Sequence, residues 1–304
     1  MALRTANVFA GLATYDVMWG LFGDGSDGEV TIAAAGTTTL DRDMFYSILT
    51  VPDTAILNTG GFRIYATKSV TVANGGTITR AGNPGSGTTA GAINAAGTLG
   101  IGAAGGAGGV GNPGAGGAGT DLSAGYPLGG SGGHGGNGSY FSGGDYGDVT
   151  APVGTKGNVR TLPWAACGHA IGAGAFSVLA GGGGGGGGSA SSGGGNGGAG
   201  GGGGGAILIA APIIVIEATG TITAQGGNGG NAMVGGGGTS ASGAGGGGGA
   251  VVLVYHTLIE TGTITVAGGI RGSYGDNPAA DTGAWPGGTT NGSAGTIRRF
   301  ALVG

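Results

Sequence analysis

The sequence predicts an all-β or irregular fold: a short-stranded, β-solenoid-like N-terminal region followed by a polyglycine-II helix lattice interleaved with buried β-strands. Glycine supplies 87 of the 304 residues, and most of it follows Gly82. Short β-prone apolar runs interrupt the glycine tracts, and the sequence Gly-Thr-Ile-Thr occurs at Gly76, Gly220 and Gly262. Glycine loses more backbone freedom on folding than any other residue, so this excess indicates backbones that approach too closely for side chains.

Residues 1–28 are predicted to be an attachment or capping segment. Its apolar residues include Val8, Trp19 and Phe22, which are the candidates for attachment to a neighbouring subunit. Arg4 and Asp16 interrupt the apolar character, and no clean apolar core precedes a cleavage site. The segment is therefore a poor match to a secretory signal.

Residues 29–82 are predicted to form a region of short β-strands. The β-prone runs are residues 30–32, 37–40, 45–51, 62–65, 70–72 and 77–79. Gly60-Gly61 and Asn74-Gly75-Gly76 separate runs as turn sequences do, and no helical period lies between them. This pattern is typical of stacked coils that bury alternate side chains.

Residues 83–304 are predicted to be a glycine-rich polyglycine-II and β repeat region with inserted loops. From Gly102 to Gly117 every third residue is glycine. A flexible linker explains neither this period nor a charged content of only 8%. Collagen requires a long Gly-X-Y run rich in proline, whereas this run contains Pro113 alone. Extended helices of three residues per turn lack internal hydrogen bonds, so we expect their backbone groups to form hydrogen bonds with neighbouring helices.

A longer repeat joins the glycine tracts to strands. Each unit has a glycine tract, an apolar strand, a second strand that ends near a glutamate, and a Gly-Thr-Ile-Thr strand. One copy comprises residues 206–223 and the next comprises residues 250–265. A truncated relative, Gly-Thr-Ile-Arg, begins at Gly295. Strands and glycine tracts therefore repeat together.

No residue pattern indicates a catalytic or cofactor site, so we expect no enzymatic activity. Glu217 and Glu260 occupy the same repeat position, which favours solvated or stacked strand positions over an acid/base pair. Cys167 and His169 are too close in sequence for a thiol and a base to face each other usefully.

Two aspartate pairs lie in turn-like sequences. Asp24 and Asp27 flank a Gly-Ser pair, and Asp145 and Asp148 flank a Tyr-Gly pair. Neither matches an EF-hand loop, and Asp-Gly is first a turn-forming sequence. We predict no metal site, with calcium at either pair as the alternative.

Charge and hydropathy limit the partners. The formal net charge is −4 and there is no basic run, which argues against a nucleic-acid partner. The apolar runs are shorter than the roughly 20 residues that a membrane-spanning helix requires. We expect no membrane insertion.

Aromatic residues gather in stretches that interrupt the glycine tracts. Aromatic side chains on loops that a rigid scaffold holds are typical of binding surfaces, and their flat rings also stack on sugars. The alternative is that they wedge the ends of the lattice. The candidate receptor-binding residues are Tyr126, Tyr140, Phe141, Tyr146, Trp164, Tyr274 and Trp285.

The alternation of glycine triplets with aromatic loops resembles the glycine-rich adhesins of bacteriophage tail fibres, which form a polyglycine-II sandwich with exposed receptor-binding loops. The tracts at residues 102–119, 129–138, 181–205 and 235–249 carry this resemblance. The opening Gly-Asp-Gly-Ser-Asp-Gly-Glu-Val-Thr-Ile at residues 23–32 is similar to the start of phage virion β-solenoids. Unlike the adhesins, this chain keeps long aliphatic strands within the glycine region.

The resemblance implies a virion structural protein of the tail or tail fibre, assembled in the host cytoplasm and exposed on the particle. It implies other virion subunits as partners, a homotrimer, and a host cell-surface glycan or outer-membrane protein as receptor. A capsid decoration or head-fibre protein is the alternative. A bacterial surface adhesin or a glycan-degrading tailspike is a further alternative; the tailspike requires two facing carboxylates.

Overall fold

A computed structural model describes residues 21–110, 114–120, 129–133, 135, 182–187, 195–233, 240–273 and 289–302. The secondary-structure elements in these ranges are all β-strands. In chain order they are β1 (Gly28–Thr31), β2 (Thr37–Thr39), β3 (Met44–Val51), β4 (Ile56–Asn58), β5 (Ile64–Val72), β6 (Thr77–Thr79), β7 (Ala206–Ala210), β8 (Ile213–Ile216), β9 (Thr221–Thr223), β10 (Ala250–Tyr255), β11 (Thr257–Glu260), β12 (Thr263–Thr265) and β13 (Thr296–Ala301).

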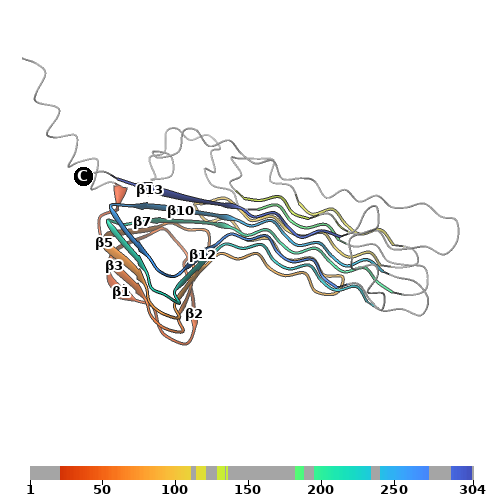
Figure 1. Ribbon diagram of the computed structural model, residues 1–304, viewed down its shortest axis with the longest axis horizontal. Helices are drawn as coiled ribbons and strands as arrows, with labels where there is room; N and C mark the ends of the chain where they lie inside the picture. Colours follow the sequence, from red (N-terminus) through yellow and green to blue (C-terminus); the bar gives the residue numbers. More distant parts are fainter. Residues whose placement is uncertain are drawn as a thin grey trace, which may run out of the picture.

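The strands pair in parallel in two sheets, which together we call the strand stack (Figure 1). The 8-stranded sheet has the order β1-β3-β5-β7-β10-β13, and β5 also pairs with β8, which pairs with β11. The 5-stranded sheet has the order β12-β9-β6-β4-β2. The first end of the strand stack is formed by β1 and β2, and the last end by β11, β12 and β13.

Alternate side chains of each strand point into a shared apolar core. Leu57, Ile78 and Ile222 are register partners on β4, β6 and β9, and all three are fully buried. Within β6 and β9 a threonine stands on each side of the isoleucine, and these threonines are half-buried on the outer side. The sequence Thr-Ile-Thr thus suits a strand with one buried and one solvated face.

The internal repeat corresponds to stacked positions. Thr221–Thr223 of β9 lies in register with Thr77–Thr79 on one side and with Thr263–Thr265 on the other. The predicted strands of both long copies are confirmed. The truncated copy behaves differently, because its strand β13 pairs with the apolar strand β10 and not with β12.

This architecture corrects the fold class expected from the sequence. The expectation of a β-solenoid-like region followed by a polyglycine-II helix lattice interleaved with buried β-strands is wrong, because strands from both regions share the same two parallel sheets. No polyglycine-II helix lattice is present among the described residues, where the glycine segments are extended chains outside the strands. The all-β part of the expectation agrees with the structure. The apolar run at β7, Ala-Ile-Leu-Ile-Ala, is buried along its whole length and pairs with β5 on one side and β10 on the other.

The described glycine segments extend side by side from the strand stack, and we call them the glycine array (Figure 1). It comprises the described residues within 82–135, 182–205, 224–249, 266–273 and 289–295. Backbone hydrogen bonds join segments that are far apart in sequence: the amide of Gly246 donates to Gly227 and the amide of Gly269 donates to Gly246, at 2.9 and 2.7 Å. A Cβ atom at Gly246 would collide with the carbonyl of Gly202. Close backbone approach, as expected, explains the glycine here.

Candidate functional site

The end of the glycine array remote from the strands is the candidate functional site. Residues 224–233 leave β9 and residues 266–273 leave β12, whereas residues 195–205 lead into β7 and residues 240–249 lead into β10. Each of these segments has one end next to a strand and one end remote from the strands. The remote ends lie together, away from the strand stack (Figure 1). We call this the distal end.

Backbone hydrogen bonds fix the distal end. The amide of Met233 donates to the carbonyl of Asn196 at 2.9 Å, and the amide of Ala232 donates to the carbonyl of Ser273 at 3.0 Å. The Asn231 side chain accepts from the amide of Ser273 at 2.9 Å. Three segments from different parts of the chain are thus held in one register.

The described surface near the distal end is mixed in character. Met233 and Ile270 are 51% and 62% exposed, and Arg271 donates to the carbonyl of Thr289 at 3.2 Å. The amide of Arg271 is held by the Asn291 side chain at 2.9 Å. Sequence reasoning missed these polar and apolar residues, although the asparagines that interrupt the glycine tracts were a usable signal.

The structure places the described residues that flank one candidate binding stretch at the distal end. Tyr274 directly follows Ser273, and Trp285 precedes Thr289 by four residues. Thr289 is tied to the neighbouring segment, because its hydroxyl donates to the carbonyl of Ser242 at 3.1 Å. Tyr274 and Trp285 themselves lie outside the described residues.

The other candidate aromatic residues have different flanks, and all of them also lie outside the described residues. The stretch with Tyr140, Phe141, Tyr146 and Trp164 lies between residues 135 and 182. A Cβ atom at Gly135 would meet the carbonyl of Gly187, whereas the amide of Gly182 donates to Gly204, next to β7. Its two described flanks therefore lie at different places: Gly135 lies towards the distal end, and Gly182 lies on the strand side.

Tyr126 lies in a stretch with both flanks on the strand side. The amide of Gly184 donates to the carbonyl of Thr120, and the amide of Gly130 donates to Gly248, close to β10. The flanks therefore separate the stretch of Tyr126 from the stretch of Tyr274 and Trp285.

Of the candidate attachment residues, Phe22 is described and Val8 and Trp19 lie outside the described residues. Phe22 is buried in a second apolar cluster on the outer side of the larger sheet, with Tyr65 and Val254. Its side chain therefore contacts this chain itself. The attachment role stays a prediction.

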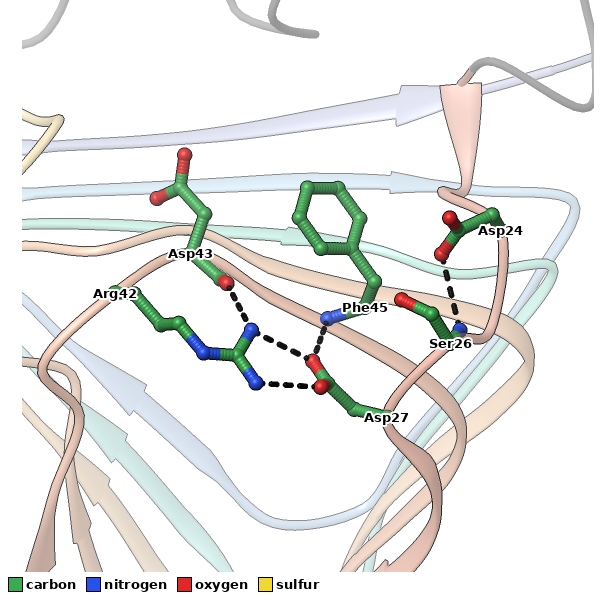
Figure 2. Close-up of polar contacts among 6 residues, drawn as sticks. All are labelled: Asp24, Ser26, Asp27, Arg42, Asp43 and Phe45. Carbon is green, nitrogen blue, oxygen red and sulfur yellow. Dashed lines mark hydrogen bonds and ion pairs between the residues drawn. The ribbon is translucent and has the colours of Figure 1, made fainter.

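The Asp24–Asp27 turn is occupied by internal contacts (Figure 2). Asp27 accepts two hydrogen bonds from the Arg42 guanidinium, at 2.6 and 3.1 Å, and one from the amide of Phe45 at 2.7 Å. These bonds, led by that from Arg42, lower the pKa of Asp27. Asp24 accepts from the amide of Ser26 at 2.9 Å, which lowers the pKa of Asp24. The calcium alternative for Asp145 and Asp148 lies outside the described residues.

The two glutamates at the shared repeat position do not face each other. Glu260 is the register partner of Ile216, so Glu217 is displaced by one residue. Glu217 accepts from the amide of Asn74 at 3.0 Å, and Glu260 forms a two-point ion pair with Arg299. Within the described ranges no cluster of three or more His, Cys, Asp or Glu residues is arranged to hold a metal ion. Cys167 and His169 lie outside them.

No family model, curated protein sequence or solved structure matches this chain. In the part of the chain that the structure describes, no helix has the length and apolar character needed to cross a membrane.

Proposed function

We propose that this chain is a non-enzymatic structural protein of a phage tail or tail fibre, and that it presents receptor-binding loops at the distal end of the glycine array. The observation that carries the proposal is the convergence of Asn196, Met233 and Ser273 at that end. The stretch that contains Tyr274 and Trp285 directly follows Ser273, and its other described flank, Thr289, donates to the carbonyl of Ser242.

The glycine array suits this role because it is cross-linked by backbone hydrogen bonds. Holding the flanks of a loop in place lowers the conformational entropy that binding removes. Aromatic side chains on such loops offer large contact areas at little rotamer cost. The partner is a host cell-surface glycan or an outer-membrane protein, and other virion subunits hold the opposite part of the chain, with a homotrimer as the proposed assembly.

A whole-cell adsorption assay tests the receptor-binding role. We expect Tyr274→Ala or Trp285→Ala to weaken adsorption of the purified chain by about tenfold or more, since buried aromatic anchors dominate binding energy. Ile213→Ala is the matched control, because Ile213 is an exposed apolar residue on β8 of the strand stack. Folded variants that all adsorb like the parent chain contradict receptor binding by this stretch.

Immunogold labelling of intact particles tests the location. Label on the tail or its fibres supports the proposal, and label on the head favours a capsid decoration or head-fibre protein. Particles without label contradict a virion role.

A further inference from the structure

The two ends of the strand stack leave strand edges without a partner strand among the described residues. At the first end β1 pairs with β3 alone and β2 pairs with β4 alone. At the last end β11, β12 and β13 each pair with one strand, which is β8, β9 and β10 respectively. Open parallel edges carry unpaired amide and carbonyl groups that can accept another strand.

The open strands at the two ends occupy the same columns of side chains. Register partners lead from Val30 through Leu49, Val70 and Ile214 to Leu258. A second series leads from Thr37 through Ile56, Thr77 and Thr221 to Thr263. β1 therefore lies in the columns of β11, and β2 lies in the columns of β12.

The free backbone groups of the two ends complement each other. In a parallel sheet, the amide and carbonyl groups of one residue point to the strand on one side, and those of the next residue point to the strand on the other side. The amide of Ile32 donates inward to Thr50, so the amide of Thr31 faces outward. The amide of Thr261 donates inward to Ile216, so the carbonyl of Leu258 faces outward at the other end. In the common register, Thr31 of one copy lies where it donates to Leu258 of the next.

The same relation holds for the smaller sheet. The amide of Leu40 donates inward to Asn58, so the amide of Thr39 faces outward. The amide of Thr263 donates inward to Gly220, so the carbonyl of Ile264 faces outward. Half-buried Leu258 and Ile264 also leave the core incompletely covered at the last end.

The two ends carry charge of opposite sign. Residues 21–43 contain one arginine, Arg42, and five carboxylates: Asp24, Asp27, Glu29, Asp41 and Asp43. Asp27 pairs with Arg42 and Asp43 pairs with Arg63, which leaves Asp24, Glu29 and Asp41 as the negative charge of the first end. The strands of the last end, β11, β12 and β13, contain one carboxylate, Glu260, and two arginines, Arg298 and Arg299. The ion pair between Arg299 and Glu260 is neutral, which leaves the last end positive. Opposite net charges favour the approach of the first end of one copy to the last end of another.

We propose that this chain associates head to tail, with β1 and β2 of one copy pairing in parallel with β11 and β12 of the next. Because Gly28 and Ala301 share a column, this contact displaces the end of β13 from Ala301 onward. The contact is heterologous, so association does not stop at two copies unless a rotation closes a ring. This inference concerns the two ends of the strand stack. It is independent of receptor binding at the distal end and of the homotrimer proposed above, which does not depend on pairing between these ends.

Sedimentation velocity of the full chain over a range of concentrations tests the proposal. We expect the mass to rise with concentration above the 27.9 kDa of one chain, and to fall with added salt. The double variant Thr31→Pro/Thr39→Pro removes two outward amides from exposed positions of edge strands, where proline is tolerated. We expect it to weaken association by about tenfold or more.

The double variant Thr31→Val/Thr39→Val is the matched control. It loses both hydroxyls and keeps both amides, so we expect native association. In a mixture with native chain, the last end of the proline variant can still bind a native copy, but its altered first end cannot bind another. The variant should therefore stop growth of the assemblies and make them shorter. Arg298→Glu provides a second variant at the exposed last end and should also weaken association. A native chain that stays at 27.9 kDa at every concentration overturns the proposal, as does native association of the folded proline variant or of Arg298→Glu.

Discussion

The ring of Phe22 packs against the imidazole of His256, with ring centroids 5.4 Å apart and planes inclined by 59°. Phe22 belongs to the first described residues, and His256 lies between β10 and β11 at the last end of the strand stack. The imidazole Nδ1 is 3.1 Å from the carbonyl of Leu302, so the same ring also contacts the residue after β13. These contacts join segments from both ends of the sequence across the outer side of the larger sheet.

Phe22→Ala should destabilise the fold. Phe22 is 5% exposed, and removing a buried phenylalanine costs about 3–5 kcal/mol in lost burial and in the cavity left behind. Chemical denaturation gives the change in the free energy of unfolding. Ile213→Ala, at a position 43% exposed, is the control and should change it by less than about 1 kcal/mol. Equal stability of both variants would contradict the packing role of Phe22.

Gly203→Ala should also destabilise the fold, for a steric reason. A Cβ atom at Gly203 would lie against the carbonyl of Gly182, closer than real Cβ contacts allow. Two backbones must move apart to admit it, at a cost of about 2 kcal/mol or more. Gly36→Ala is the matched control, because a Cβ there has no neighbour within 4 Å. Thermal or chemical denaturation should separate the two variants, and an unchanged Gly203→Ala would contradict close packing.

The strands were largely predictable because their local patterns are strong. Residues 77–79 and 221–223 alternate threonine with a buried isoleucine, which suits a strand with one solvated face. β4 (Ile56–Asn58) was missed, because three residues without a flanking pattern carry too little local signal. β5 was expected as two runs, but Thr67, Lys68 and Ser69 continue it with outward or half-buried side chains.

The pairing of distant strands could not be predicted locally. β5 pairs first with β7 and then with β8, although the intervening chain contains most of the glycine array. No pattern within β5 specifies that partner; what selects it is the buried apolar face that β7 and β8 share. For the same reason, the aromatic residues of the candidate site were recognisable, but the arrangement of their flanks at the distal end was not.

The stability of the fold should depend on pH through Asp27. Its pKa is lowered from 3.8, chiefly by the hydrogen bonds from Arg42. A carboxyl group whose pKa is lower in the folded chain than in the unfolded chain stabilises the fold fully at pH values above its unfolded pKa. This stabilisation is lost as the pH falls through its folded pKa. We therefore expect native protein to be more stable than Asp27→Asn at neutral pH. This difference should begin to shrink as the pH falls below about 4 and should be gone below the folded pKa of Asp27.

Denaturation of both proteins at several pH values measures this difference. Asp41→Asn is the control, because Asp41 is an exposed carboxylate in the turn before β3. A difference between native protein and Asp27→Asn that persists unchanged in acid would show that Asp27 acts through its shape and not through its charge.

Tyr46 should titrate later than an exposed tyrosine. It is 1% exposed on β3, and burial raises its pKa to about 12. The unfolded chain loses this proton near pH 10, so unfolding becomes more favourable as the pH rises from 10 towards 12. Tyr46→Phe removes the titrating hydroxyl, so its stability should fall less over this range. Ultraviolet titration of the phenolate should show a late-titrating tyrosine in the native protein that is missing from Tyr46→Phe. Identical titration curves above pH 10 would contradict the burial of this hydroxyl.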